Sequence, residues 1–188
     1  MMGFMGDDEA VRERDRLVTA LAGLPAGDGY SLGCVAGLDA EEVVRRLGAR
    51  PIDVTADELR LWGEIDPFSA EAESTVGVST VPGGCVVLQP WGFAAADNTL
   101  LNRLSEGTVA YGMYANPKSG NQGGVHRDGV TEAWDLHPGG GVDDDEPDDV
   151  LAALYEDEPV AYCCAFVGLK PTDHRAFTSP DRWLRLPS

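Results

Sequence analysis

Positively charged residues are scarce in this chain. Its 188 residues include 14 lysines and arginines against 32 aspartates and glutamates, so the formal net charge is −18 at pH 7. Nucleic acids and anionic membranes are bound through basic surface, and this balance therefore excludes both as direct partners. The same charge favours a basic protein partner, although a generally acidic surface is the simpler explanation.

Long apolar runs and export signals are also missing. The longest apolar run, Val160–Leu169, has about half the length that a membrane span requires. The first residues lack a positively charged stretch and soon turn acidic, so we expect no signal peptide and a cytoplasmic protein. The cysteines form no Cys-x-x-C pair, which predicts buried free thiols at Cys34, Cys85, Cys163 and Cys164.

The patterns that accompany common catalytic chemistry are absent. There is no Gly-x-Ser-x-Gly nucleophile turn and no Gly-Lys-Ser phosphate loop. A zinc site would require His126, His137 and a carboxylate such as Asp135 to converge. The expected hairpin register instead pairs His126 with Thr131. We therefore expect no metal site, no cofactor and surface-exposed histidines, and we favour binding over catalysis.

The clearest structural signal lies between Gly107 and His137. Val109, Tyr111 and Met113 alternate with small residues, which is the pattern of a half-buried strand. Asp128-Gly129 separates two further strand-like runs, and this dipeptide favours a type I′ hairpin turn because it tolerates positive φ. We therefore place this stretch in the middle of an antiparallel sheet.

Helix signals occur on both sides of this stretch. Asp7–Leu24 carries its apolar residues on one face, as an amphipathic helix does. Asp39–Glu42 and Thr55–Glu58 form two capping boxes, each of which begins a helix. Asp97 predicts a further helix start, and Pro147 suits the first turn of another.

Strand signals add a second hairpin. Tyr30–Ala36 alternates larger and smaller residues, which predicts a strand. Ser74–Val81 and Gly84–Gln89 flank the turn dipeptide Pro82-Gly83, which predicts two paired strands. Pro90 then leads the chain out of the sheet.

These elements predict one α+β domain over residues 1–188, in which an antiparallel sheet of about five to six strands carries helices mainly on one face. An N-terminal helix lies within residues 1–28, and residues 138–149 form a Gly-rich and acidic loop insertion. Near the end of the chain, Val160–Leu169 is expected to be a strand or a buried segment. Ser179–Asp181 is expected to open a short helical turn around Trp183.

The predicted loop Asn116–Gly124 is the first candidate for binding. Its glycines and polar residues could form an anion-binding nest of backbone N–H groups. A long hairpin connection explains it more simply, but loops of this composition often carry function. Its candidate contact residues are Asn116, Lys118, Asn121 and Gln122.

Two further features are candidates. Trp91 lies between Pro90 and Gly92 at the end of a strand, where it could offer an exposed aromatic contact or pack over the sheet edge. The acidic run after the glycines offers oxygen atoms for a weak cation site, but it lacks the Gly and Glu positions of a calcium-binding EF-hand loop. Its first members are Asp143, Asp144 and Asp145.

Two segments resemble an uncharacterised actinobacterial domain family of unknown function. The first is GCVAGLDAEEVVRRLGARP, Gly33–Pro51. The second is GGCVVLQPWGFAAADNTLLNRLSEGTVAYGMYANPKSGNQGGVHRDGVTEAWD, Gly83–Asp135. The resemblance implies an extended segment entering a Glu-Glu-Val helix, a hairpin with Trp-Gly, a Leu-Ser helix end and an Asp-Gly hairpin. It implies no catalytic residue.

The sequence supports two classes of function. The first is an acidic module that binds a basic protein, such as an immunity-like, inhibitor or regulatory protein. The second is a small-ligand-binding domain or small enzyme that uses the Asn116–Gly124 loop and a neighbouring pocket.

Overall fold

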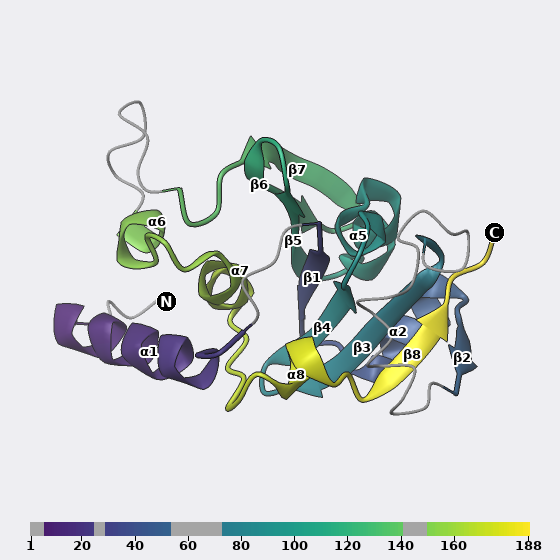
Figure 1. The fold of residues 1–188 in the computed structure, drawn as a ribbon, viewed down its shortest axis with the longest axis horizontal. Helices are drawn as coiled ribbons and strands as arrows, with labels where there is room; N and C mark the ends of the chain where they lie inside the picture. The colour runs from purple at the N-terminus through teal and green to yellow at the C-terminus, as the bar shows by residue number, and fades with distance from the viewer. Residues whose placement is uncertain (1–5, 25–28, 54–72, 141–149) are drawn as a thin grey trace.

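A single antiparallel sheet of eight strands organises the computed structural model, which describes residues 6–24, 29–53, 73–140 and 150–188 (Figure 1). The strand order is β2-β8-β3-β4-β1-β5-β6-β7. The strands are β1 Ser31–Ala36, β2 Arg50–Ile52, β3 Thr75–Val81, β4 Gly84–Gln89, β5 Val109–Asn116, β6 Gly120–Arg127, β7 Val130–Leu136 and β8 Arg182–Arg185.

The expected number of five to six strands is too low. The short strands β2 and β8 extend the sheet beyond β3, and their pairing partners lie far away in the sequence: Thr75 of β3 pairs with Arg185 of β8. Strands of three and four residues are too short to show a clear alternation of apolar and polar side chains.

The expected hairpins are confirmed. β3 and β4 pair across Pro82-Gly83, and β6 and β7 pair across Asp128-Gly129. Asp128 has φ 50° and Gly129 has φ 85°, which are the two positive values that a type I′ turn requires. The register brings His126 opposite Thr131, as the sequence predicted.

Six helices lie in the described residues. They are α1 Asp7–Ala20, α2 Ala40–Leu47, α5 Asn98–Leu104, α6 Val150–Leu154, α7 Pro159–Val167 and α8 Arg175–Thr178, with a 3-10 turn η2 at Ala94–Ala96. The side chains of Asp39 and Asp97 cap α2 and α5, as predicted. The second capping box, Thr55–Glu58, and the expected helix start at Pro147 lie outside the described residues.

The predicted capping box of α2 forms only in part. The carboxylate of Asp39 accepts a hydrogen bond from the backbone N–H of Glu42, 2.8 Å away. The carboxylate of Glu42 binds Arg45 and Arg46 instead of the cap, and these bonds lower the pKa of Glu42 to about 2. Arg46 in turn donates to the carbonyl of Leu104, which ties α2 to the end of α5.

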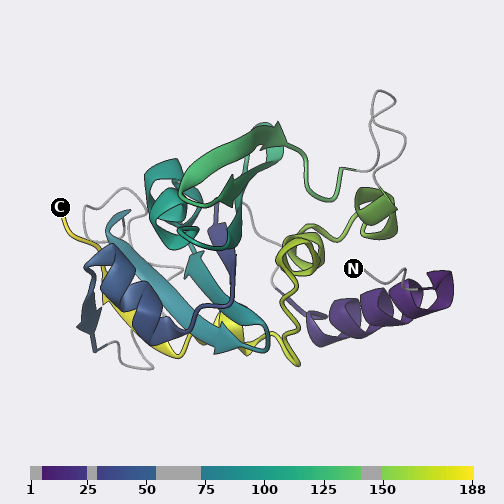
Figure 2. The same ribbon diagram turned by 180° about the vertical axis from the view of Figure 1, so that it is seen from behind.

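Helices cover both faces of the sheet, and the expectation of mainly one covered face is wrong. One core cluster joins Leu32 and Cys34 of β1 to α1 and α7, and the other joins Val35 of β1 to α2 and α5. In Figure 1, α1, α6 and α7 lie together on one side of the central strands, and Figure 2 shows α2 and α5 from the opposite side. The cause is that β1 and β4 are apolar at consecutive positions, which buries both of their faces.

The C-terminal segment corrects two further expectations. Val160–Leu169, predicted as a strand or a buried segment, is buried but helical: it forms most of α7. A continuous apolar run does not distinguish a buried helix from a buried strand, whereas Pro159 at the helix start and the left-handed Gly168 at its end are helix signals. Trp183 lies in strand β8 instead of a helical turn, and it is buried.

Candidate functional site

Four neighbouring strands place their ends together at one end of the sheet. Ser31, the first residue of β1, lies opposite Gln89, the last residue of β4, and opposite Tyr114 near the end of β5. β3 runs antiparallel to β4, so its first residue, Thr75, lies at the same end. The connections that leave these strands therefore meet, although they are far apart in the sequence.

These connections enclose a cleft with a volume of about 490 Å³. That volume lies in the range of small-ligand pockets, roughly 300–1,000 Å³. The lining residues are mostly apolar or aromatic, with one carboxylate: Gly29, Glu73, Gln89, Trp91, Gly92, Phe93, Ala94, Tyr114 and Pro117. Among the described residues the cleft is thus an aromatic hollow with one carboxylate.

The side chain of Gln89 holds one wall of the cleft in place. It is fully buried at the end of β4. Its Nε2 donates to the carbonyl oxygens of Glu73 at 3.1 Å and Thr75 at 3.2 Å, and its Oε1 accepts a hydrogen bond from the backbone N–H of Ala94 at 2.7 Å. One amide therefore joins the start of β3 to the loop that carries Trp91 and Phe93.

Backbone contacts fix the other side of that loop. The N–H of Gly92 donates to the carbonyl of Gly29 at 2.8 Å, and the N–H of Gly29 donates to the carbonyl of Ala115 at 2.6 Å. Gly92 has φ 125°, and a Cβ atom there would lie 2.5 Å from Oε1 of Gln89. Position 92 therefore requires glycine, both for its backbone conformation and for the close approach of Gln89.

The aromatic side chains of the cleft are partly exposed. Trp91 is 37 % exposed and Phe93 is 50 % exposed. The ring of Phe93 packs edge-on against Tyr114, with centroids 5.5 Å apart and an angle of 86° between the planes. Ordered, solvent-facing aromatic rings of this kind favour contact with a ligand or partner, because little conformational entropy is lost on binding.

The predicted loop Asn116–Gly124 is mostly strand, so this expectation is wrong. Asn116 pairs with Gly120, and only three residues form the turn between β5 and β6. The physical reason is that glycine favours turns and weakens strands, so the sequence gives no strand signal here, but the neighbouring strands β5 and β7 still pair with this segment. Pro117 is the residue of this turn that lines the cleft.

The polar side chains of this region mainly support the hairpin. Oδ1 of Asn116 accepts a hydrogen bond from the backbone N–H of Lys118 at 2.9 Å, and its Nδ2 donates to Gln122 at 3.4 Å. Nδ2 of Asn121 donates to the carbonyl of Pro138 at 3.3 Å. The structure therefore brings Pro117, and none of the four predicted polar residues, into the lining of the cleft with Trp91, and the amides of Asn116 and Asn121 make internal hydrogen bonds. Asp143, Asp144 and Asp145 lie outside the described residues.

His126 is buried, and the expectation of a surface histidine is wrong. Its Nδ1 lies 2.8 Å from Oδ1 of Asn102 on α5, which also accepts a hydrogen bond from the hydroxyl of Thr131. Since Oδ1 of Asn102 only accepts, Nδ1 of His126 carries the proton. Burial lowers the pKa of His126. This polar cluster ties the β6–β7 hairpin to α5.

The four cysteines are buried and free, as expected. The thiols of Cys34 and Cys164 lie 3.9 Å apart in the core between β1 and α7. The hydrogen bond between them and their burial raise the pKa of Cys34, and burial raises that of Cys85 to about 12. Such thiols are poor nucleophiles and poor metal ligands. Within the described ranges no group of His, Cys, Asp or Glu is arranged to hold a metal ion.

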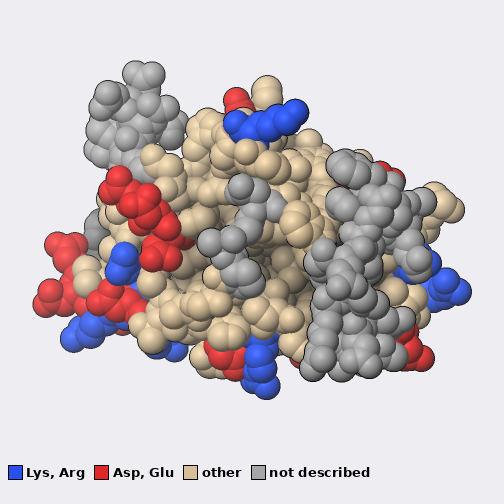
Figure 3. Space-filling model, in the orientation of Figure 1, with Lys and Arg blue, Asp and Glu red and all other residues tan. Residues whose placement is uncertain are grey.

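Charged side chains of both signs lie around the rim of the face that Figure 3 shows. Acidic side chains gather at the end that carries α1 and α6, with basic side chains among them, and the described atoms in the middle of the face are mainly uncharged. The first turn of α1 alone carries Asp7, Asp8 and Glu9. These three carboxylates make the start of α1 locally acidic.

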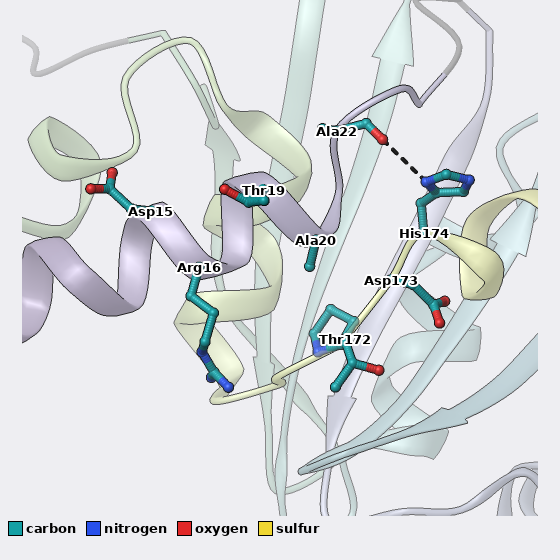
Figure 4. Close-up of a pocket in the computed structure, with 9 residues that line it drawn as sticks. Asp15, Arg16, Thr19, Ala20, Ala22, Thr172, Asp173 and His174 are labelled. Carbon is teal, nitrogen blue, oxygen red and sulfur yellow. Dashed lines mark hydrogen bonds between the residues drawn. The ribbon is translucent and has the colours of Figure 1, made fainter.

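A second hollow lies between α1 and the segment before α8. Figure 4 shows Arg16 and Asp15 on α1 and Asp173 and His174 on the facing segment. Nδ1 of His174 lies 3.1 Å from the carbonyl oxygen of Ala22. Arg16 is paired with Glu13, and Asp173 with Arg175, so the charges around this hollow are already neutralised by neighbours. It offers no convergent set of groups for a ligand.

No helix in the described part of the chain is long and apolar enough to cross a membrane. A family model described as a family of unknown function, DUF6461, matches residues 19–158. The match covers both segments on which the resemblance rests and extends beyond them on either side. Neither the search among curated proteins nor the search among solved structures found a match.

Proposed function

The chain belongs to the DUF6461 family of unknown function, and we propose that it is an interaction module that binds a basic protein partner. The partner would dock at the sheet end that bears the cleft of Trp91, Phe93 and Tyr114. Immunity-like, inhibitor and regulatory proteins act by binding another protein in this way. The free thiols support a reducing, cytoplasmic setting for it.

The observation that carries the proposal is the ordered aromatic cleft on an acidic chain. Trp91 and Phe93 stay partly exposed although buried Gln89 and glycine contacts fix their loop. Protein interfaces concentrate their binding energy in aromatic anchors of this kind. The net charge of −18 supports a basic partner, because it speeds the approach of positive surfaces.

A second candidate function is the binding of a small molecule. It is supported by the concave shape of the cleft and its volume of about 490 Å³, and by Pro117, which belongs to the Asn116–Gly124 segment and lines the cleft. This candidate predicts that a ligand occupies the cleft without any macromolecular partner.

The interaction is tested by retention of partners on the immobilised chain in extracts of the native host. We expect retained proteins of basic composition to be present at 50 mM salt and strongly reduced at about 500 mM salt, because salt screens charge attraction. The double variant Trp91→Ala/Phe93→Ala is expected to lose the same proteins.

The matched control is Trp134→Ala, which removes a tryptophan that is 75 % exposed and lies outside the cleft. It should retain the same partners as the wild type. Identical retained proteins on the wild type and on the double variant would contradict the proposed function. Circular dichroism on each variant verifies that the fold is kept.

A further inference from the structure

The cleft at the sheet end has the chemistry of a site for a positively charged side chain. It combines the rings of Trp91, Phe93 and Tyr114 with the carboxylate residue Glu73. No lysine or arginine is among the described residues that line it. Aromatic faces attract cations through their quadrupole, and a carboxylate adds a direct charge interaction.

The rings are arranged to contact a flat group. Phe93 and Tyr114 meet nearly at right angles, at 86°, so together they form a corner and not a closed stack. A planar group can lie against one ring and touch the edge of the other. The ring of Trp91 packs closely against Gly29, where an added Cβ atom would lie 3.3 Å from its Cε3 atom.

The carboxylate residue is held near these rings by the backbone. The carbonyl of Glu73 accepts a hydrogen bond from the buried side chain of Gln89, whose other end binds Ala94 beside Phe93. Glu73 is exposed, so its side chain is accessible to a partner. Lys118, exposed in the turn beside Pro117, opposes the attraction of a cation but does not line the cleft.

We propose that the cleft receives an arginine side chain of the basic partner, stacked on the aromatic rings and paired with Glu73. Arginine fits better than lysine because its guanidinium is planar, weakly hydrated and able to bind a carboxylate through two parallel hydrogen bonds. This inference rests on the proposed function, since it names the group of the partner that the module binds.

The test is a titration of the 15N-labelled full chain, followed by NMR, with three capped peptides that differ at one position. The peptides are acetyl-Gly-Arg-Gly-amide, its lysine counterpart and its citrulline counterpart, which has the shape of arginine without the charge. We expect the arginine peptide to shift the amides of Gly92 and Phe93 and the indole N–H of Trp91, which Trp91→Phe identifies. Its affinity should exceed that of the citrulline peptide at least fivefold.

Two variants separate the parts of the site. Glu73→Gln is expected to weaken the arginine peptide about fivefold and to leave the citrulline peptide unchanged, since only the charge is removed. Trp134→Ala should change neither affinity. Equal binding of arginine and citrulline peptides, equal binding of lysine, or shifts confined to other surfaces would each overturn the proposal.

The result also separates this inference from the proposed function. If the arginine peptide binds at the cleft but no basic protein is retained from extracts, the site stands and the interaction function fails. In that case free arginine or another small guanidinium compound, titrated in the same way, becomes the ligand to examine. If partners are retained but the peptides leave the cleft unchanged, the interaction stands and the arginine site fails.

Discussion

Trp91 and Trp134 are both exposed, yet they belong to very different regions. Trp134 is 75 % exposed on β7, the last strand of the sheet, whereas Trp91 is 37 % exposed in a cleft at the end of the central strands. Exposure alone does not make a tryptophan a candidate for binding. Trp91 is the candidate because its loop is held by hydrogen bonds and other aromatic side chains line the same cleft.

The two regions are also held by different buried polar residues. Gln89 joins the cleft loop to β3 with three hydrogen bonds to backbone groups. His126 joins the hairpin of Trp134 to α5 through the side chain of Asn102. An amide keeps the same charge at every pH, while a histidine titrates. The stability of the cleft region is thus expected to stay constant in mild acid, whereas the stability of the hairpin is expected to decrease.

Gly92→Ala is expected to have the largest effect on the cleft region. It places a side chain at φ 125° and brings a Cβ atom within 2.5 Å of Gln89 Oε1, so we expect a loss of about 4 kcal/mol in the free energy of unfolding. Urea denaturation followed by circular dichroism measures it.

The matched control is Gly120→Ala, at φ 79° with nothing within 4 Å of the added atom. Gly120→Ala should lower the free energy of unfolding by only about 1–2 kcal/mol, because the left-handed backbone conformation is its only unfavourable feature. Equal losses at the two positions would show that the contact with Gln89 does not restrict position 92.

Gln89→Leu is expected to have the next largest effect. The substitution keeps the size of the side chain but leaves two carbonyl groups and one N–H without their partner, and we expect a loss of about 3 kcal/mol in the free energy of unfolding. The arginine peptide should lose its binding as well. Gln122→Leu, at a half-buried residue with one bond of 3.4 Å, should cost less than about 1 kcal/mol. A loss below about 1 kcal/mol in Gln89→Leu would contradict the proposal that Gln89 holds the cleft wall in place.

Local signals in the sequence predicted a large part of this fold. Asp39 and Asp97 cap helices, and Asp128-Gly129 forms a hairpin turn, because each of these structures depends on residues within four positions of one another. The resemblance to a family of unknown function rested on motifs that are continuous in the chain, and the family model confirms it. Trp91 was a candidate because it lies between Pro90 and Gly92 at a strand end, and its partial exposure agrees with that position, while its role in binding stays a prediction.

Interactions between distant residues could not be predicted in this way. The contact of Gln89 with Glu73 and the burial of His126 against Asn102 depend on which strands and helices become neighbours. The polar Gln89 at the end of the apolar strand GCVVLQ is nevertheless a signal, because a buried amide must find partners. Phe93, in the loop before η2, and Tyr114, in β5, carry no comparable signal, since a single aromatic residue in a sequence usually belongs to the core.

The hairpin of Trp134 should weaken as the pH falls. Burial lowers the pKa of His126 in the folded protein, so the unfolded chain, with a pKa of about 6.5, takes up the proton first. The free energy of unfolding is therefore greatest above pH 6.5 and decreases below it, by at most about 1.4 kcal/mol per pH unit. Urea denaturation between pH 5.5 and 8 measures this slope. His126→Gln should flatten this slope, and an unchanged slope in that variant would contradict the assignment.

Trp134→Ala is expected to have the smallest effect, below about 0.5 kcal/mol in the free energy of unfolding, because the ring is mostly in water. The same substitution at Trp91 should reduce binding of the arginine peptide at least tenfold. Urea denaturation and the NMR titration together compare the two tryptophans in one chain. If Trp134→Ala weakened peptide binding as much as Trp91→Ala, the peptide would also bind at the edge strand β7. The hydrogen bonds of Gln89 that hold the cleft loop would then not explain where the peptide binds.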